Sequence, residues 1–348
     1  MKHTHLHTRL LALLLCCALL LPLSACGEAK STTQQIFAMD TVMDLTAYGK
    51  KADDGINAAI SIINSMDTLL DPENERSKTY EINHAMGSPV VVNEQIAKML
   101  RTALTVYERT NGAFDLTTYP LSKLWGFIDQ NYRVPSDAEI ERLLPCVDMS
   151  KVQLAATDDS ANSLVTMPAD MALSFGAVAK GCASEYAIQA MRAAGVTSGV
   201  VSLGGNVQTL GKKPDGSDWN IAIQDPNDTG SYLGYLTVGE TAVITSGSYQ
   251  RYFTEGGQKY HHILSPTTGR PVNNGLLAVT IVCEDGTLAD CLSTAMFVLG
   301  PQAALNYWRT YGGFEMLLVK TDGHVVLTNG LYGQFTPNGD SYVVDYAS

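Results

Sequence analysis

Hydrophobic and polar residues alternate along the chain in patterns that predict both strands and helices. Apolar residues at every second position within residues 35–48 indicate strands. Residues 56–70 and 93–112 instead place apolar residues three and four positions apart, which predicts helices with one buried face. In the second of these helices, Asn93 is expected to be the N-cap, and Gly112 follows the last turn.

The rest of the chain adds elements of both kinds. Hairpins are predicted at 151–167 and at 314–329, the latter turning at Asp322-Gly323. Further helices are predicted at 176–196, closed by Gly195, at 287–300 and at 301–313, and further strands at 199–203, 219–223, 233–238 and 276–286. Since these elements mix without a strict βαβ rhythm, we expect an α+β fold of mixed sheets with packed helices, in a single large domain or two closely joined lobes.

The first residues follow a different pattern. Lys2 and Arg9 precede the short apolar run "LLALLLCCALLLPL", which predicts a secretory signal peptide over residues 1–25. Leu23-Ser24-Ala25-Cys26 resembles a bacterial lipobox, in which Cys26 is lipidated; plain cleavage after Ala25 is the alternative. We therefore expect a tether at 26–34, a folded domain at 35–348, and export with lipid anchoring at Cys26 to the outer face of the cytoplasmic membrane or on its periplasmic side.

Composition and charge narrow the possible partners. Charged residues make up 17% of the chain and hydrophobic ones 45%, which is typical of a packed globule. Removing residues 1–25 takes away Lys2 and Arg9 and no acidic residue, so the net charge changes from −12 to −14. This charge opposes nucleic acid and anionic lipid surfaces as partners, and an anionic ligand would need its own cluster of donors.

The cysteines do not predict a disulfide framework. Beyond Cys26 the chain holds Cys146, Cys182, Cys283 and Cys291, with no CxxC motif. A single Cys283–Cys291 bridge is left open.

Several common catalytic motifs are missing from the sequence, including GxxxxGK[ST], GxGxxG after a strand, HExxH and GxSxG. Candidate chemistry therefore lies elsewhere. Phe114-Asp115 follow a helix end, where an ordinary cap with a buried phenylalanine is the alternative. Lys180 lies among small residues where a helix begins, a place that attracts anions but also suits tight packing. Gly204-Gly205 allow close approach of a ligand or form a plain turn.

Asp290 and Thr294 are four residues apart on a predicted helix, so that both side chains lie on one face. Their oxygens suit Mg²⁺ rather than a soft metal. The alternative role of Asp290 is to complement the helix dipole from the first turn.

Residues 243–271 are rich in polar donors. Ser246, Gly247 and Ser248 can form a cluster of hydroxyl and N–H groups, and Arg251 or Arg270 could supply positive charge. The adjacent residues His261 and His262 would point to opposite faces of a strand. We therefore expect only one of them to enter a given site, and the other to be half-exposed and structural.

Taken together, eight segments resemble the FAD:protein FMN transferase (ApbE) family, older name thiamine-biosynthesis lipoprotein. They occur in the family's order and cover nearly all of the predicted domain: "AMDTVM", "GAFDLTTYPLSKLWGF", "GAVAKGCASEYA", "VVSLGGNV", "WNIAIQDP", "TSGSYQRYF", "YHHILSPTTGRPV" and "ADCLSTAMFVLG".

The resemblance implies that residues 35–348 form a flavin transferase domain. Such an enzyme uses Mg²⁺, moves FMN from its substrate FAD to a serine or threonine hydroxyl of an acceptor protein, and releases AMP. The implied acceptor is a flavoprotein or an electron-transfer subunit. By motif position, the residues implied to contact FAD, several through their backbone, are Met39, Leu70, Ala113, Phe114, Asp115, Ser174, Lys180 and Leu264. The implied Mg²⁺ ligands are Asp290, Thr294, the Ala177 carbonyl and Ser293, and the implied base is His262.

The sequence departs from the family's motifs at four positions. Asp40 replaces the glycine of Met-Gly-Thr, and Asn206 replaces an acidic residue after Gly204-Gly205. Ser174 and Ser265 each stand where the family has aspartate. Three of these four changes remove a carboxylate.

These residues suggest a mechanism for phosphoryl transfer. His262 would accept the proton of the attacking hydroxyl, because histidine has a pKa near neutral pH. Mg²⁺ and Lys180 would offset charge on the phosphoryl oxygens. The sequence leaves two alternatives open: a Mg²⁺-dependent FAD pyrophosphatase with water as the acceptor, and a lipid-anchored solute-binding protein.

Overall fold

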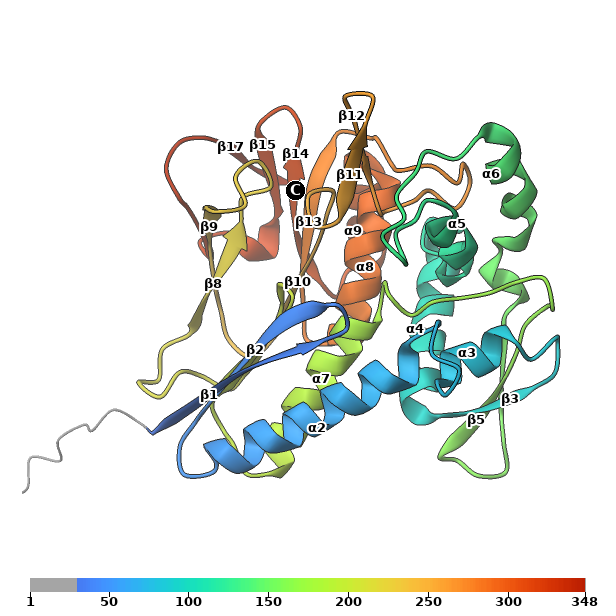
Figure 1. Ribbon diagram of the computed structural model, residues 1–348. Helices are drawn as coiled ribbons and strands as arrows, with labels where there is room; N and C mark the ends of the chain where they lie inside the picture. Colours follow the sequence, from blue (N-terminus) through green and yellow to red (C-terminus); the bar gives the residue numbers. More distant parts are fainter. Residues whose placement is uncertain (1–29, 348) are drawn as a thin grey trace, which may run out of the picture. The chain divides into compact units, whose positions relative to one another are not determined.

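The computed structural model describes residues 30–347, so the predicted signal peptide and Cys26 lie outside the described residues. Within this range the main feature is a nine-stranded sheet, with strands in the order β1-β2-β6-β7-β10-β13-β14-β15-β17 (Figure 1). Neighbouring strands are antiparallel except for the parallel pair β15–β17. The strands are β1 Ser31–Ala38, β2 Thr41–Tyr48, β6 Gly199–Leu203, β7 Asn206–Leu210, β10 Ala242–Gly247, β13 Leu276–Cys283, β14 Glu315–Lys320, β15 His324–Thr328 and β17 Val343–Ala347.

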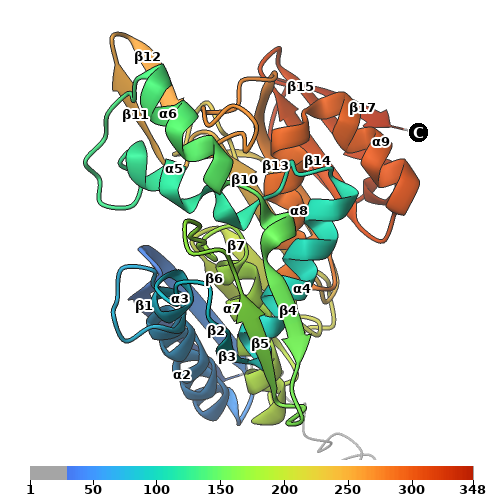
Figure 2. The same ribbon diagram turned by 90° about the vertical axis from the view of Figure 1, so that its right-hand side faces the viewer.

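One face of this sheet is covered by helices, which Figure 2 shows from the side. The helices are α2 Ala52–Leu70, α4 Glu94–Arg109, α7 Ala179–Ala193, α8 Gly286–Leu299 and α9 Pro301–Tyr311. The other face packs against a three-stranded sheet of β16 Phe335–Pro337, β9 Tyr232–Val238 and β8 Trp219–Gln224. Successive side chains of a strand point to opposite faces of the sheet, so one strand can contribute to both cores. In β14, Met316 and Leu318 face the helices, while Leu317 and Val319 face the small sheet.

The remaining elements lie at the periphery of these layers. A second three-stranded sheet contains β3 Val90–Asn93, β5 Asn162–Thr166 and β4 Gln153–Ala156, and a hairpin is formed by β11 Tyr252–Glu255 and β12 Gln258–His261. The short helices are α3 Lys78–Asn83, α5 Tyr119–Leu124 and α6 Asp137–Leu143. Trp125, Phe127 and Leu264 form a separate buried cluster in which Phe253 and Tyr260 of this hairpin also pack. This cluster brings the hairpin against the segment that contains α5.

The structure confirms the α+β fold class and most of the predicted elements. Asn93 caps α4 by accepting a hydrogen bond from the Ile96 N–H at 3.1 Å. The pattern over residues 35–48 forms two strands, β1 and β2, joined at Met39-Asp40. Helix α7 begins at Ala179, three residues after its predicted start, and residues 176–178 form a loop before it.

One prediction from the sequence needs correction. Residues 31–34 are not a tether, since they belong to β1 and pair in register with β2 from Ser31 opposite Tyr48. The bridge between Cys283 and Cys291, which the sequence left open, is not formed: both cysteines are free, as are Cys146 and Cys182. Among the described residues, no helix has the length and hydropathy needed to cross a membrane.

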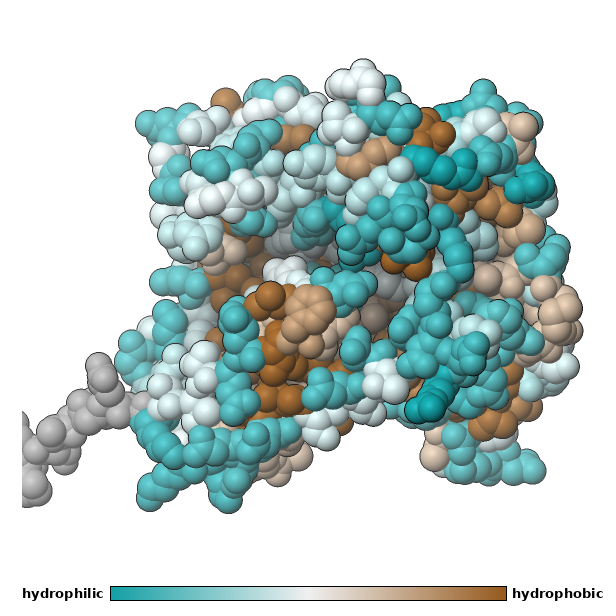
Figure 3. Space-filling model, in the orientation of Figure 1, coloured by the Kyte–Doolittle hydropathy of each residue, from teal (hydrophilic) through white to brown (hydrophobic). Residues whose placement is uncertain are grey.

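The turn between β1 and β2 lies at the molecular surface. Phe37 and Val42 are paired across the two strands and are 72% and 49% exposed. Figure 3 shows apolar side chains gathered over this hairpin. The turn is therefore accessible, and Met39 and Asp40 within it both have positive φ angles, of 48° and 57°.

Candidate functional site

The site is built where helices α7 and α8 approach each other closely. A Cβ on Gly181 would lie 2.6 Å from Asp290 Cβ and would clash with the Gly286 carbonyl. A Cβ on Gly286 would lie 2.7 Å from the Gly181 carbonyl oxygen. Two glycines face each other here because only their missing side chains permit this contact. As a result, the first turn of α7 lies directly beside Asp290 of α8.

The Asp290 carboxylate is buried at this contact and held by two donors. The Gly181 N–H donates to Oδ2 at 2.8 Å, and the side-chain amide of Asn206 donates to Oδ1 at 3.0 Å. Burial raises the pKa of Asp290, and the nearby Lys180 charge and these two hydrogen bonds act in the opposite direction. Asp290 is only 3% exposed, so a cation at this position would offset much of its desolvation.

Three hydroxyl groups lie on the same side of α8 as Asp290. Ser246 Oγ of β10 lies 2.8 Å from Ser293 Oγ and 3.1 Å from Thr294 Oγ1. Ser293 also donates to the main-chain carbonyl of Asp290 at 2.9 Å. The structure thus brings together Asp290, Ser293, Thr294 and the serine predicted from residues 243–271. Ser248 does not join them, because its hydroxyl donates to the Leu277 carbonyl at 3.3 Å.

Lys180 is the positive charge that acts on both Asp290 and His262. It is half-buried at the start of α7, and among the described residues no ion pair or hydrogen bond of its ammonium group is found. A cation that has no close ion pair within the described residues, and whose charge acts on both a buried carboxylate and an imidazole, is typical of an anion-binding site.

His262 is held in the tautomer that leaves a basic nitrogen available. Its Nδ1 lies 3.1 Å from the Arg251 carbonyl oxygen, which can only accept, so Nδ1 carries the proton and Nε2 has a free lone pair. Burial and then the Arg251 charge lower the pKa of His262 to about 3, and Lys180 adds to this effect. The imidazole is therefore neutral at physiological pH, and its pKa lies well below the near-neutral value expected from the sequence, because burial and the Arg251 charge disfavour the protonated ring.

The neighbouring His261 serves the fold instead. Its Nε2 donates to the Val272 carbonyl at 2.7 Å, and its Nδ1 accepts from the Ile263 N–H at 3.3 Å. Both ring nitrogens are thus occupied. The prediction that the second histidine is half-exposed was wrong, because His261 is only 7% exposed while His262 is half-buried.

Arg251 and Arg270, the two candidate cations from the sequence, lie in different surroundings. Arg270 pairs with Asp137 of α6 at the surface. Arg251 donates to the Phe127 carbonyl at 3.3 Å and lies 3.9 Å from the Asp40 carboxylate. Arg251 is the one next to His262, because its main-chain carbonyl is bonded to His262 Nδ1 and the ring of Phe127, whose carbonyl it contacts, lies 6.4 Å from the imidazole.

The two loop segments predicted to bind FAD are also adjacent. The Ser174 N–H donates to the Leu116 carbonyl at 3.1 Å, which joins the segment that contains Ala113 to the loop before α7 that contains Ala177. The side chain of Asp115 is fully engaged, with Oδ1 accepting from Thr117 and Oδ2 from the Met149 N–H. Burial raises the pKa of Asp115. These bonds hold the Asp115 side chain in the fold, and a contact of Asp115 with FAD stays a prediction.

The other residues implied to contact FAD differ in exposure. Phe114, Leu70 and Leu264 are buried, at 1%, 6% and 6% exposure. Met39 is half-buried, and its N–H donates to Asp67 of α2 at 2.8 Å. These side chains pack in the core, so that direct contact with FAD, as predicted from motif position, stays a prediction for each of them.

Asn206 is a site residue that the sequence alone did not identify as a partner of Asp290. It was noted only as a departure from the family motif, and its signal was its position after Gly204-Gly205. The contact could not be found from spacing, because it joins residues 84 positions apart.

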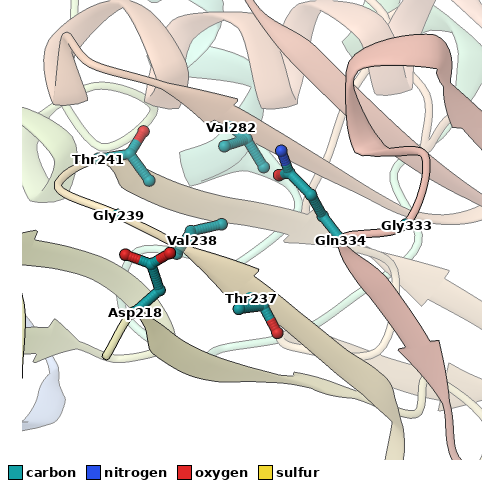
Figure 4. A pocket seen from close by; sticks show the side chains of 8 residues that line it. All are labelled: Asp218, Thr237, Val238, Gly239, Thr241, Val282, Gly333 and Gln334. Carbon is teal, nitrogen blue, oxygen red and sulfur yellow. The ribbon is translucent and has the colours of Figure 1, made fainter. Parts of the chain in front are cut away.

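A pocket of about 340 Å³ lies elsewhere, between β9, β13 and the segment before β16 (Figure 4). Its lining includes Asp218, Thr237, Thr241 and Gln334. It contains no residue predicted to bind FAD or Mg²⁺, so we do not assign it to the site.

Comparisons of the sequence and the fold with known proteins identify the family of this chain. The sequence profile described as the ApbE family matches residues 39–318. A FAD:protein FMN transferase of Klebsiella pneumoniae is 30% identical, over 81% of this chain and 87% of that protein. One of Treponema pallidum is 29% identical, over 88% and 90%. The crystal structure of the ApbE protein of Thermotoga maritima superposes with a TM-score of 0.81 at 30% identity, covering 88% of this chain and 99% of that one.

Proposed function

Because the chain belongs to the ApbE family and is a flavin transferase, we propose that it moves FMN from FAD to a serine or threonine hydroxyl of an acceptor protein and releases AMP. The observation that carries this proposal is the joint position of Asp290, Lys180 and His262. The first turn of α7 binds the buried Asp290 carboxylate through the Gly181 N–H, and it carries Lys180, whose charge acts on both Asp290 and the neutral imidazole of His262. These groups match the needs of a phosphoryl transfer.

The residues around Asp290 fit a magnesium ion. A buried carboxylate and the hydroxyls of Thr294, Ser293 and Ser246 form a set of hard oxygen donors. Mg²⁺ usually takes one or two protein carboxylates and completes its shell with water and substrate phosphates, so one aspartate is sufficient. We propose Asp290 and Thr294 as ligands, with Ser293 and the Ala177 carbonyl beside them. When bound, the ion would neutralise charge on the phosphate oxygens.

His262 acts as the general base in this proposal. Nε2 takes the proton of the acceptor hydroxyl as that oxygen forms a bond to the FMN phosphorus. The bond between this phosphorus and the AMP oxygen breaks, and its electron pair leaves with AMP. The hydrogen bond of Nδ1 to the Arg251 carbonyl fixes the ring orientation, and Lys180 offsets the negative charge of the diphosphate.

The proposed function is tested by measuring AMP release and the mass of the acceptor protein in one experiment. The protein is incubated with FAD, Mg²⁺ and the soluble domain of a candidate electron-transfer subunit. We expect AMP release and an acceptor heavier by one FMN. Asp290→Ala should lower both by about 100-fold or more, because it removes the only carboxylate of the proposed Mg²⁺ ligands. Asp322→Ala, which changes an exposed aspartate in the β14–β15 turn, is the control and should have no effect.

Other outcomes of this experiment separate the alternatives. AMP release without a change in acceptor mass would favour a FAD pyrophosphatase with water as the acceptor. Unchanged AMP release in Asp290→Ala would remove the proposed Mg²⁺ site. The relatives that match over most of the chain are transferases, which disfavours a solute-binding protein.

A further inference from the structure

Arg251 carries a guanidinium group that the fold uses only in part. Nη1 donates to the Phe127 carbonyl at 3.3 Å, and Nη2 lies 3.9 Å from Oδ2 of Asp40. A guanidinium has five N–H donors in a planar fork. Within the described residues these two contacts are all that it makes, and its side chain remains 41% exposed. Most of its hydrogen-bonding capacity is therefore available to a ligand.

The main chain of Arg251 is held next to the base. The Arg251 carbonyl accepts the hydrogen bond from His262 Nδ1, so the main chain of residue 251 cannot move away without releasing the imidazole. The guanidinium itself is held by the Phe127 carbonyl, and the Phe127 ring lies 6.4 Å from that of His262. Lys180 acts on the same imidazole from α7. The charges of Arg251 and Lys180 therefore both act on His262, in a chain whose net charge is −12. Within the described residues, Lys180 has no ion pair and Arg251 has only the long one to Asp40. Such local clustering in an acidic protein favours the binding of an anion.

Asp40, the acidic partner of Arg251, occupies an unfavourable backbone position. Its φ angle is 57° and that of Met39 is 48°, a left-handed region that glycine adopts without cost. The chain therefore places a carboxylate opposite Arg251 where a residue without a side chain would suit the turn better.

We propose that Arg251 is a further substrate-binding residue, which holds the diphosphate of the dinucleotide beside His262, and that Asp40 is its counter-ion when no substrate is bound. The inference rests on the proposed function in taking FAD as the substrate. A phosphate group can accept two parallel N–H bonds from the guanidinium fork, whereas the Asp40 carboxylate is 80% exposed and lies at the limit of an ion pair. The phosphate therefore displaces the carboxylate readily.

The experiment measures KM and kcat for FAD from AMP release with Mg²⁺, for the wild type and four variants. Arg251→Gln should raise KM about 10-fold or more, the effect of losing a charge-assisted hydrogen bond. Arg251→Lys should restore part of this loss, because it keeps the charge without the fork. Asp40→Asn should lower KM by roughly 2- to 5-fold, as expected for an exposed competing ion pair.

Arg270→Gln is the matched control, since Arg270 is also an exposed arginine but pairs with Asp137 on α6. Its KM should equal that of the wild type. A KM in Arg251→Gln equal to that in Arg270→Gln would overturn the proposal, and so would a higher KM in Asp40→Asn. Because Asp40 is exposed, the Asp40→Asn arm does not depend on the stability of the arginine variants.

A binding measurement separates this inference from the proposed function. The Kd for FAD is measured by flavin fluorescence, and that for inorganic pyrophosphate with Mg²⁺ by calorimetry. If the wild type released no AMP, the proposed function would fail, while a Kd that weakens about 10-fold in Arg251→Gln would still support the phosphate contact. An unchanged Kd for both probes would refute the phosphate contact, whatever the turnover.

Discussion

At the scale of single residues, His261 and His262 show how surroundings assign different roles to identical side chains. His261 has both ring nitrogens bonded to the main chain and packs edge-on against Phe297. His262 uses only Nδ1, and its ring faces Phe127. Burial lowers the pKa of both histidines, and at His262 the Arg251 charge adds to this effect. Only His262 therefore has a lone pair free for catalysis.

The lowered pKa of His262 predicts how stability depends on pH. The ordinary value is 6.5 and the folded value about 3, so between these pH values the unfolded chain binds more protons. The contribution of neutral His262 to the free energy of unfolding is therefore fully present above about pH 6.5 and is lost as the pH is lowered toward 3. In His262→Gln, the free energy of unfolding should decrease less steeply over this range, by up to about 1.4 kcal/mol per pH unit. Urea unfolding at pH 7, 6, 5 and 4 measures it, and equal slopes for both proteins would show that the prediction is wrong.

The contact of Asn206 with Asp290 leads to a prediction about how a metal ion affects the stability of a variant. Asn206→Asp replaces the donor to Asp290 Oδ1, 3.0 Å away, by a second buried carboxylate, whose charge repels the first. We expect the free energy of unfolding to fall by about 2 kcal/mol or more without metal, and to recover in millimolar Mg²⁺. Thermal unfolding with EDTA or Mg²⁺ measures both states. The same loss of stability in both would argue against a cation beside Asp290.

At the scale of elements, the crossing of α7 and α8 determines whether the site exists. Gly181 and Gly286 permit the contact, and the Gly181 N–H then reaches Asp290. The loop before α7, held by the hydrogen bond of Ser174 to Leu116, brings the predicted FAD-binding segments to the same helix end. A change in this crossing would thus affect both the metal ligands and the phosphate-binding groups.

Gly181→Ala tests the role of this crossing. The new Cβ would meet the Gly286 carbonyl and Asp290, so we expect a loss of about 1–3 kcal/mol of stability and at least about a 10-fold loss of AMP release. The control is Gly176→Ala in the adjacent loop. Its Cβ would lie 3.5 Å from Ser174 Oγ, an ordinary contact. Chemical denaturation measures the stability of both variants, and an AMP assay measures their activity. Equal losses of stability and activity in the two variants would contradict the proposed role of the crossing.

At the scale of the whole molecule, the nine-stranded sheet separates two buried cores and positions the site on its helical side. Strand β10 supplies Ser246 from the sheet, while α7 and α8 supply Lys180 and Asp290 from the helical layer. The β11–β12 hairpin then brings His262 to the same region. The site thus depends on elements that are distant in the chain.

The N-terminal segment predicts where this domain acts. We propose that the protein is exported and lipid-anchored at Cys26, from its lipobox-like sequence. In a bacterial host, the full chain should incorporate labelled fatty acid and fractionate with membranes. Cys26→Ser should abolish the label and release the protein into the soluble fraction, while Cys146→Ser should leave both unchanged. Labelling of Cys26→Ser would rule out this anchor.

The sequence by itself determined the elements and the main candidates for chemistry. Periodicity and caps act over a few residues, so α4 with its Asn93 cap and the hairpin at Asp322-Gly323 could be predicted locally. The pairing of Asp290 with Thr294 on one helical face follows from the helix period in the same way. Lys180 and the adjacent histidines were also candidates from their local sequence, and the similarity of eight segments to a family selected His262 of the two.

The tertiary structure decided which of these groups meet. The Gly181 N–H and Asp290 are 109 positions apart, and Asn206 and Asp290 are 84 apart. It also selected Arg251 over Arg270 and assigned the two histidines their different roles. Such contacts depend on how helices pack on a sheet, which is set by side-chain volume and burial across the whole fold rather than by any local pattern.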